Sequence, residues 1–432
     1  MPEQIHRLYE IFREHPAIST DSRRNVSGAI YFALKGDKYD GNRYAADALV
    51  KGAVIAVVDD AGLENVPGMF YVEDVLHTLQ SLAKYHRHQS KATVIALTGS
   101  NGKTTTKELM ASVLSEKFIT NSTAGNLNNH IGVPITLLSV KNDTEFCIVE
   151  MGANHPGEIF LLCEIADPDY GLITNIGKAH LEGFGSMEGV LSAKSELYDY
   201  IRKKQGRIFI NDDNPLLMRK GKGIPQISYG KSNTCFCSGT LLKKYPKVSL
   251  QLHCSENNFR VDTNLVGDYN LENILAAAAV GSYFGIPPSA IASALSSYSP
   301  ENLRSQWIET SKNVLIMDAY NANPTSMQTA IQNFASGPYR NTMVILGEML
   351  ELGASSQAEH QNLVDFVNSK CDSIKDSVFI GKNFSSVVPK PGLFFESTDQ
   401  FLDYLNKKPI VNKTILIKGS RGNQLERIIK ML

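Results

Sequence analysis

The chain has 432 residues, 43% of them apolar and 20% charged, and its 43 Lys and Arg nearly balance its 44 Asp and Glu. This length predicts two or three hydrophobic cores, and the balanced charge argues against a nucleic-acid-binding or membrane-surface protein. No apolar run nears the ~20 residues that span a bilayer, and the first residues lack the pattern of a signal peptide, so we expect a cytoplasmic protein without membrane insertion.

The first 89 residues predict a small α/β domain. Apolar runs at residues 29–34 and 54–58 predict buried strands, and residues 44–50 between them have helical spacing. A second helix follows, with leucines three residues apart, and ends in a polar stretch near residue 90. We therefore place a domain boundary after residue 89.

Residues 90–298 predict a larger second domain. An apolar strand at residues 93–97 leads into a glycine-rich loop, and an amphipathic helix follows it. Buried runs then alternate with helical stretches, which indicates a parallel sheet covered by helices on both faces. The further buried runs are residues 146–149, 171–174 and 208–210.

Residues 235–265 break this alternation and predict short antiparallel strands. Cys235 and Cys237 form a Cys-x-Cys pair with no second pair nearby, which is weak evidence for a metal site. Their alternation is more typical of one face of a strand. The six cysteines are scattered, and we expect reduced, free thiols. A helix over residues 271–283 closes the domain.

The glycine-rich loop at residues 98–105 (TGSNGKTT) has the context that a phosphate site requires. Glycines let backbone N–H groups converge on an anion, the helix N-terminus adds its positive end, and Lys103 supplies a charge. Thr104 is placed to put its hydroxyl on Mg²⁺. The match to G-x-x-x-x-G-K-[ST] is incomplete because Leu97 takes the place of the first glycine. A chance glycine turn is the alternative, which the strand and helix on either side disfavour.

Two side chains follow strands at the same predicted edge of this sheet. Glu150 ends the strand that begins at residue 146, where an acid holds Mg²⁺ or is simply solvated. His180 follows the next strand, and a lone histidine is more often structural than a ligand.

A lysine falls on the apolar face of the helix after Ser186. Met187, Leu191, Tyr198 and Ile201 define this face, and Lys194 lies three residues after Leu191 and four before Tyr198. One reading is that the stem is buried and the ammonium reaches water. The other is that desolvation lowers the pKa of the amine, which then takes up CO₂ as a carbamate able to bind Mg²⁺. The sequence leaves both open.

Residues 299–432 predict another α/β domain, because four buried runs alternate with helices. Asp318 ends the first of these strands, and Asn323 precedes a proline that begins a helix, so this segment faces a ligand-binding edge. The four runs are residues 314–317, 343–346, 378–380 and 414–417.

Over nearly its whole length the chain resembles the Mur ligase family of peptidoglycan synthesis. The segments that carry the resemblance are residues 98–108 (TGSNGKTTTKE), 125–138 (GNLNNHIGVPITLL), 150–159 (EMGANHPGEI), 175–186 (NIGKAHLEGFGS), 318–327 (DAYNANPTSM), 346–353 (LGEMLELG) and 418–422 (KGSRG). The resemblance implies a small α/β UDP-sugar-binding domain at residues 1–89. It implies an ATP-binding domain with a P-loop-type, mainly parallel sheet at 90–298, and a Rossmann-like α/β ligase domain at 299–432.

The resemblance also implies the site residues. Lys103, His180 and Lys194 would act in catalysis, and Ser22 with Arg23 would hold the uridine diphosphate, although a plain polar turn is the alternative there. Asn321 and Asn323 would bind the dipeptide, near the loop at 346–353. Two Mg²⁺ ions would be held by Thr104, Glu150, His180 and a carbamylated Lys194. The implied ATP-binding set is Gly99, Ser100, Asn101, Gly102, Lys103, Thr104, Thr105, Asn270, Asn273, Arg304 and Asp318, with Asn270 as a plain helix cap the competing reading.

The implied activity is an ATP-dependent ligation through an acyl phosphate. UDP-N-acetylmuramoyl-tripeptide and D-alanyl-D-alanine would be joined by an amide bond, and a related ligase adding another amino acid is the alternative. A nucleotide switch is a rival from another class, but the chain has no N-K-x-D guanine motif. We expect a monomer without nucleic acid partners, and the third residue of the tripeptide stays open.

Overall fold

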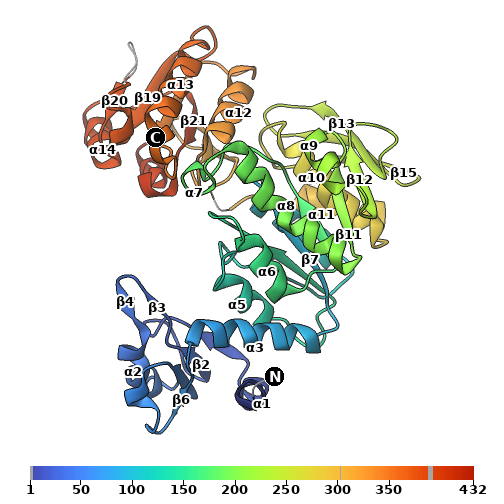
Figure 1. Cartoon of the computed structure of the whole chain (residues 1–432). Coiled ribbons are helices and arrows are strands. Elements are labelled where there is room, and N and C mark those ends of the chain that lie inside the picture. The colour runs from blue at the N-terminus through green and yellow to red at the C-terminus, as the bar shows by residue number, and fades with distance from the viewer. Residues whose placement is uncertain (1–2, 302, 388–392) are drawn as a thin grey trace.

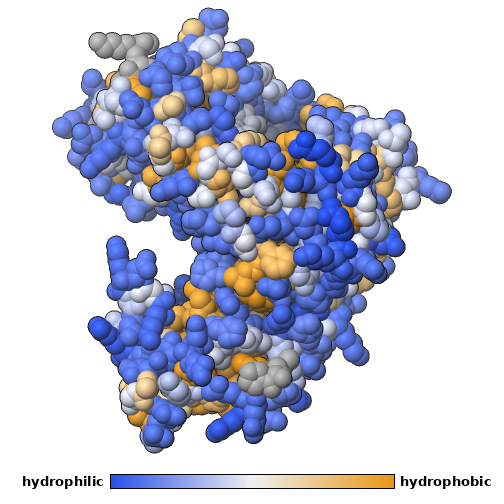
Figure 2. Space-filling view, viewed as in Figure 1, coloured by the Kyte–Doolittle hydropathy of each residue, from blue (hydrophilic) through white to orange (hydrophobic). Residues whose placement is uncertain are grey.

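The computed structural model describes residues 3–301, 303–387 and 393–432. Three sheets of four or more strands follow one another along the chain, and each is packed against helices (Figure 1). The N-terminal and C-terminal sheets lie on the same side of the central one, so the chain has the outline of a C. The space-filling view shows a largely hydrophilic surface that is hollowed between these two ends (Figure 2). The predicted α/β class with mainly parallel sheets is confirmed.

The N-terminal sheet has four parallel strands in the order β1-β2-β5-β6. The sequence predicted β2, α2, β5 and α3 but missed α1 and the three-residue strands β1 and β6, which are too short for a periodic pattern. A two-stranded hairpin of β3 and β4 projects from the unit. The elements are α1 (Glu3–Glu14), β1 (Ala17–Ser19), β2 (Ala29–Phe32), β3 (Lys35–Gly36), β4 (Tyr39–Asp40), α2 (Ala45–Val50), β5 (Ile55–Val58), β6 (Met69–Tyr71) and α3 (Val75–Gln89).

The central sheet has nine strands in the order β15-β14-β13-β12-β11-β10-β7-β9-β8. Its first six strands in sequence, β7 to β12, run parallel, and β14 pairs antiparallel with both β13 and β15, as the sequence predicted for residues 235–265. The strands are β7 (Thr93–Thr98), β8 (Thr120–Ser122), β9 (Phe146–Glu150), β10 (Tyr170–Ile173), β11 (Arg207–Asn211), β12 (Gln226–Gly230), β13 (Cys237–Lys243), β14 (Ser249–Cys254) and β15 (Asn257–Asp262).

Helices cover both faces of this sheet because successive side chains of its strands point to opposite sides. One apolar cluster joins alternate residues of β7 and β9 to α3, α5, α6, α8 and α9, and the other joins the intervening residues to α4, α10 and α11. The helices are α4 (Lys103–Ser115), α5 (Gly132–Leu138), α6 (Glu158–Ala166), α7 (Leu181–Phe184), α8 (Met187–Lys204), α9 (Pro215–Gly221), α10 (Asn270–Tyr283) and α11 (Pro288–Ser297).

The C-terminal sheet has six strands in the order β16-β17-β21-β18-β19-β20, parallel except for β16. Its two faces bury separate apolar clusters, one under α12 and α13 and one under α14 and the C-terminal turns. The elements are β16 (Gln306–Glu309), β17 (Val314–Asp318), α12 (Pro324–Ala335), β18 (Thr342–Gly347), α13 (Ser356–Asn368), β19 (Asp376–Ile380), β20 (Leu393–Phe395), α14 (Thr398–Lys407) and β21 (Thr414–Lys418).

Two expectations from the sequence are wrong. Cys237 and Cys254 lie directly opposite each other on β13 and β14 and form a disulfide, so these two thiols are not free. Met187, placed on the apolar face of α8, is 38% exposed at the first turn of the helix, before the buried face begins. Among the described residues, no helix is long and apolar enough to cross a membrane.

Candidate active site

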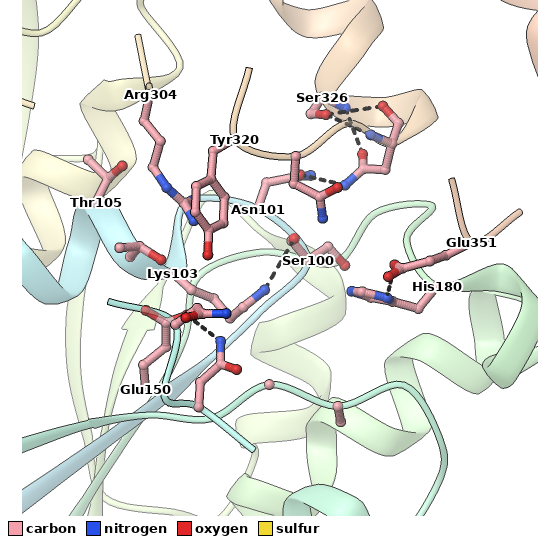
Figure 3. A pocket seen from close by; sticks show the side chains of 18 of the residues that line it. Ser100, Asn101, Lys103, Thr105, Glu150, His180, Arg304, Tyr320, Ser326 and Glu351 are labelled. Atoms are coloured by element: carbon pink, nitrogen blue, oxygen red, sulfur yellow. Dashed lines mark hydrogen bonds and ion pairs between the residues drawn. The ribbon is translucent and has the colours of Figure 1, made fainter. Parts of the chain in front are cut away.

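A cavity of about 1110 Å³ lies where the central and C-terminal units face each other. The loops that follow β7, β9 and β10 line it from the central unit, and those that follow β17 and β18 line it from the C-terminal unit (Figure 3). The end of β21 and the loop after it complete the lining. Carboxyl ends of parallel strands are the usual place for ligand sites in such sheets. Both units therefore turn their ligand-binding edges toward one space.

The glycine-rich loop forms the floor of this cavity. Gly99 has a φ of 148°, and a Cβ there would lie 1.9 Å from Thr174 Oγ1, so only glycine fits. Gly102, in the left-handed region, is the N-cap of α4, and Lys103 Nζ donates to the Gly99 carbonyl at 2.7 Å. The loop thus points an uncapped helix N-terminus and a lysine at the cavity, which is the arrangement predicted for phosphate binding.

The environment of Glu150 fits a cation. Its side chain is 1% exposed, and Oε1 accepts from Asn128 Nδ2 at 2.8 Å, while Oε2 is buried without a hydrogen-bond partner among the described residues. Thr104, whose hydroxyl was predicted to bind Mg²⁺, also lines the cavity. No cluster of three or more His, Cys, Asp or Glu side chains with metal-binding geometry occurs in the described parts of the chain. The donor set therefore fits Mg²⁺ held by few protein groups and by phosphate oxygens.

His180 reaches the same cavity from the loop after β10. Its Nδ1 lies 2.6 Å from Glu351 Oε2 of the C-terminal unit, a contact that is an ion pair when the imidazole is protonated (Figure 3). The neighbouring His180, and then the charge of Lys103, hold the pKa of Glu351 below its usual value. The histidine that the sequence assigned to a metal thus has a carboxylate of the other unit as its partner.

Lys194 is completely buried in α8, at 0% exposure, so its ammonium does not reach water and the snorkelling alternative is wrong. Its Nζ has no hydrogen-bond partner among the described residues and lies 5.7 Å from the centre of the Phe184 ring. Burial, reinforced by the charge of Lys103, lowers the pKa of this amine from 10.5 to about 7. Lys194 lies outside the lining of the cavity.

Four of the predicted nucleotide ligands come from α10 and the C-terminal unit. Asn270 is not a helix cap: Tyr269 holds that position, and Asn270 Oδ1 accepts from Asn273 Nδ2 at 2.9 Å. Arg304 stacks on Tyr320, with its guanidinium 3.9 Å from the ring centre. Asp318 accepts from the buried Lys418 at 2.5 Å. These groups line the cavity together with the phosphate loop.

The predicted uridine and dipeptide residues are differently placed. Ser22 and Arg23 lie in the N-terminal unit, outside the cavity lining, and the exposed Arg23 pairs with Asp21 at 2.8 Å. Asn323 caps α12 by accepting from the Ser326 N–H, and its Nδ2 donates to Asn101 Oδ1 of the phosphate loop at 2.8 Å. Its side chain is therefore committed to the helix cap and to the contact between the two units.

Sequence reasoning did not single out several charged and aromatic residues that line the cavity: Tyr320, Glu351, Lys418 and Arg421. All four lie in segments that carried the family resemblance, at residues 318–327, 346–353 and 418–422. Lys418 ends β21, and the other three lie in the loops that follow β17, β18 and β21. Their place at the carboxyl ends of strands is the signal that would have found them.

Three parts of the chain match models of one protein family. Residues 16–100 match the Mur ligase family, catalytic domain; residues 97–281 match the Mur ligase middle domain; and residues 303–421 match the Mur ligase, glutamate ligase domain. The chain therefore belongs to the Mur ligase family, and the resemblance read from its sequence is confirmed.

Individual relatives narrow the comparison. The UDP-N-acetylmuramoyl-tripeptide–D-alanyl-D-alanine ligase of Bacillus subtilis is 35% identical, over 96% of this chain and 92% of its own length; that of Escherichia coli K12 is 33% identical, over 96% and 93%. Among solved structures, MurF from Acinetobacter baumannii is 31% identical with a TM-score of 0.86, covering 96% of this chain and 92% of its own. MurF ligase from Thermotoga maritima, solved with ADP, is 25% identical with a TM-score of 0.85, covering 100% and 98%. The predicted three-part ligase fold is confirmed.

Proposed function

We propose that the chain joins D-alanyl-D-alanine to UDP-N-acetylmuramoyl-tripeptide, using ATP and passing through an acyl phosphate. The observation that carries this proposal is the shared cavity, in which the phosphate loop of the central unit faces charged loops of the C-terminal unit. The relatives that match over almost the whole chain carry this activity in their names. The domain assignment follows: residues 1–89 hold the UDP end, 90–298 bind ATP, and 299–432 complete the site.

The proposed reaction has two steps. A carboxylate oxygen of the tripeptide attacks the γ-phosphorus of ATP, the bond to the β-phosphate oxygen breaks, and ADP leaves. Lys103 exchanges its contact with the Gly99 carbonyl for phosphate oxygens, and the N–H groups that open α4 bind the same charge. The dipeptide amine then attacks the acyl carbon and loses a proton, and phosphate departs as the amide forms. Positioning by the two units supplies most of the catalysis.

Thr104 and Glu150 are the residues that would hold Mg²⁺, since the free oxygen of Glu150 is buried and unsatisfied. A bound Mg²⁺ would supply positive charge to the phosphate oxygens. For a second ion we propose His180 and a carbamylated Lys194, whose neutral amine would add to CO₂ with loss of a proton. Lys194→Ala should lose most activity and recover part of it with added short-chain carboxylates. Full activity without rescue would contradict the carbamate.

The nucleotide itself would lie between the loop at residues 99–105 and the groups that face it. Asn270 and Asn273 would contact the base, and Arg304 with Asp318 would contact phosphate and ribose. Ser22 and Arg23 would hold the uridine diphosphate, and the dipeptide would bind near Asn321 and Asn323.

Phosphate release is the direct test of this function. Purified protein is incubated with ATP and Mg²⁺, and UDP-muramoyl-tripeptide and D-alanyl-D-alanine are added singly and together. Release that needs both organic substrates, with the pentapeptide product seen by mass spectrometry, supports the ligase. Release with neither substrate would indicate a nucleotide switch, and turnover only with another amino acid would indicate a different ligase of the family. Lys103→Met serves as the inactive control.

A further inference from the structure

Two loops of the C-terminal unit meet at the rim of the cavity. One follows β18 and contains Glu348 to Gly353; the other follows β21 and contains Gly419 to Gln424. The loops are tied together: the Leu350 N–H donates to Ser420 Oγ at 3.0 Å, and the Ser420 N–H donates to the Glu348 carbonyl at 3.3 Å. Since β18 and β21 are paired neighbours in the sheet, the two loops form one surface, which we call the loop platform.

The loop platform carries one carboxylate, that of Glu351, which has no ion-pair partner in the described part of its own unit. Among the described residues, the C-terminal unit brings only Asp318 and Glu351 into the cavity lining as acids, and Asp318 is paired with Lys418. Glu351 is 51% exposed, and its single ion-pair partner, His180, belongs to the central unit. The backbone of Glu351 lies in the left-handed region, at a φ of 63°. This conformation is unfavourable for a residue other than glycine, so the surrounding loop has to hold it in place.

The loop platform also carries one positively charged side chain, that of Arg421, which has no acidic partner among the described residues. Of the three cations that the described C-terminal unit brings to the lining, Lys418 is paired with Asp318 and Arg304 is stacked tightly on Tyr320. The third, Arg421, has no ion-pair partner in the described parts of the chain, and its guanidinium lies a looser 5.4 Å from the Tyr320 ring. A guanidinium is suited to bind a carboxylate with two parallel hydrogen bonds.

The loop platform presents one carboxylate, whose single charged partner His180 belongs to the central unit, and one guanidinium without an acid; these two charges complement the two ends of a small zwitterion. D-alanyl-D-alanine has an ammonium at one end and a carboxylate at the other, about 7 Å apart when extended. We propose that Glu351 binds the ammonium and Arg421 the carboxylate of the incoming dipeptide, an inference that rests on the proposed function. The ammonium end then faces His180 and the phosphate loop, where the acyl phosphate has to form. Asn323, already engaged as a helix cap, is not needed for this recognition.

The carboxylate half is tested by changing ligand and protein together. Wild-type protein, Arg421→Gln and the control Arg427→Gln, which lies outside the cavity and pairs with Asp399, are assayed with D-alanyl-D-alanine and with its C-terminal amide. A charge-assisted pair predicts that amidation lowers kcat/KM of the wild type and control about 10–100-fold. In Arg421→Gln the two ligands should differ less than about 3-fold, and Arg421→Lys should restore part of the discrimination. Discrimination retained in Arg421→Gln, or a raised KM for ATP instead, would overturn the assignment.

The ammonium half is tested by Glu351→Gln beside Glu348→Gln, a carboxylate of the same loop that lies outside the cavity lining and accepts from the Asn383 N–H. We expect the KM for the dipeptide to rise about tenfold or more only in Glu351→Gln, while the KM for ATP and the Mg²⁺ requirement change less than about twofold. A raised Mg²⁺ requirement with an unchanged dipeptide KM would show that Glu351 acts through His180, and would overturn the inference. Wild-type protein that makes no product with both substrates would instead refute the proposed function itself.

Discussion

Replacing Lys194 by methionine should stabilise the central unit while abolishing ligation. Methionine keeps the length and most of the volume of the lysine stem, and it removes a charge that is buried at 0% exposure without a hydrogen-bond partner in the described structure. Functional sites commonly retain such groups at the expense of stability. Lys203→Met, at an exposed position one residue before the end of the same helix, is the matched control.

The size of the effect follows from the pKa of the amine, which burial lowers from 10.5 to about 7. At about 1.4 kcal/mol per pH unit this corresponds to about 4–5 kcal/mol at pH 7. The folded-state pKa of Lys194 lies below the unfolded value, so the destabilisation of the folded state by its buried charge is fully present below pH 7. It then shrinks as the pH rises and is lost above 10.5, because the unfolded chain binds the extra proton throughout this window.

Hydrogen exchange of α8 is the suitable assay, since the single tryptophan, Trp307, lies in β16 of the C-terminal unit and does not report on this helix. In CO₂-free buffer at pH 7, the slowest amides of α8 should exchange about a thousandfold more slowly in Lys194→Met than in wild-type protein. The ratio should fall about tenfold for each pH unit above 7. Equal exchange in the two proteins, or a ratio independent of pH, would refute the reasoning and indicate that the amine has found a partner.

Three further predictions concern the loop, the contact between units and the thiols. Gly99→Ala should abolish binding of an ATP analogue in calorimetry, because its Cβ would lie 1.9 Å from Thr174 Oγ1. Gly157→Ala, whose φ of 86° also disfavours a side chain but which has open space around it, controls for backbone strain and should bind the analogue normally. Lys178 of the central unit and Glu359 of the C-terminal unit form an ion pair at 2.7 Å. Lys178→Glu should therefore lower kcat/KM about 2–5-fold, and the double exchange with Glu359→Lys should restore it. High salt should remove the difference between the single variant and the wild type. Burial raises the pKa of Cys147 to about 12, so at pH 8 Ellman's reagent should modify the exposed Cys371 rapidly and Cys147 only after unfolding; fast modification of Cys147 in native protein would contradict its burial.

The long buried strands and the phosphate loop could be predicted because their signal is local. β7, β9 and α4 each combine an apolar pattern with a recognisable terminus. Strands of three residues, such as β1 and β6, carry too few residues for a period, and their existence depends on neighbours distant in sequence. The disulfide of Cys237 was missed for the same reason, since the register of β13 and β14 decides which residues face each other.

The site residues that could be predicted are those whose signal lies within a single segment of the chain. Lys194 was identified because a lysine interrupts the apolar face of one helix, and only the packing showed that its ammonium has no route to water. The contact of His180 with Glu351 joins loop residues that are far apart in sequence and belong to different units, so no local pattern contains it. The same holds for the pairing of Asp318 with Lys418, which follows from the adjacency of β17 and β21.

The polar groups that the fold leaves unsatisfied indicate where ligands complete it. Of eight buried side-chain atoms without a hydrogen-bond partner among the described residues, those of Glu150 and Arg304 belong to residues lining the cavity, and that of Lys194 lies on the adjoining helix. A third atom from the lining, His180 Nδ1, has Glu351 as its charged neighbour. Each such group costs about 1–3 kcal/mol when it stays unpaired, so a ligand that satisfies it recovers that free energy on binding. Because these groups come from two units, the recovery is greatest when both units close on the same ligand. We therefore expect ATP binding to favour closure of the C-terminal unit, because a ligand held by both units satisfies polar groups of both.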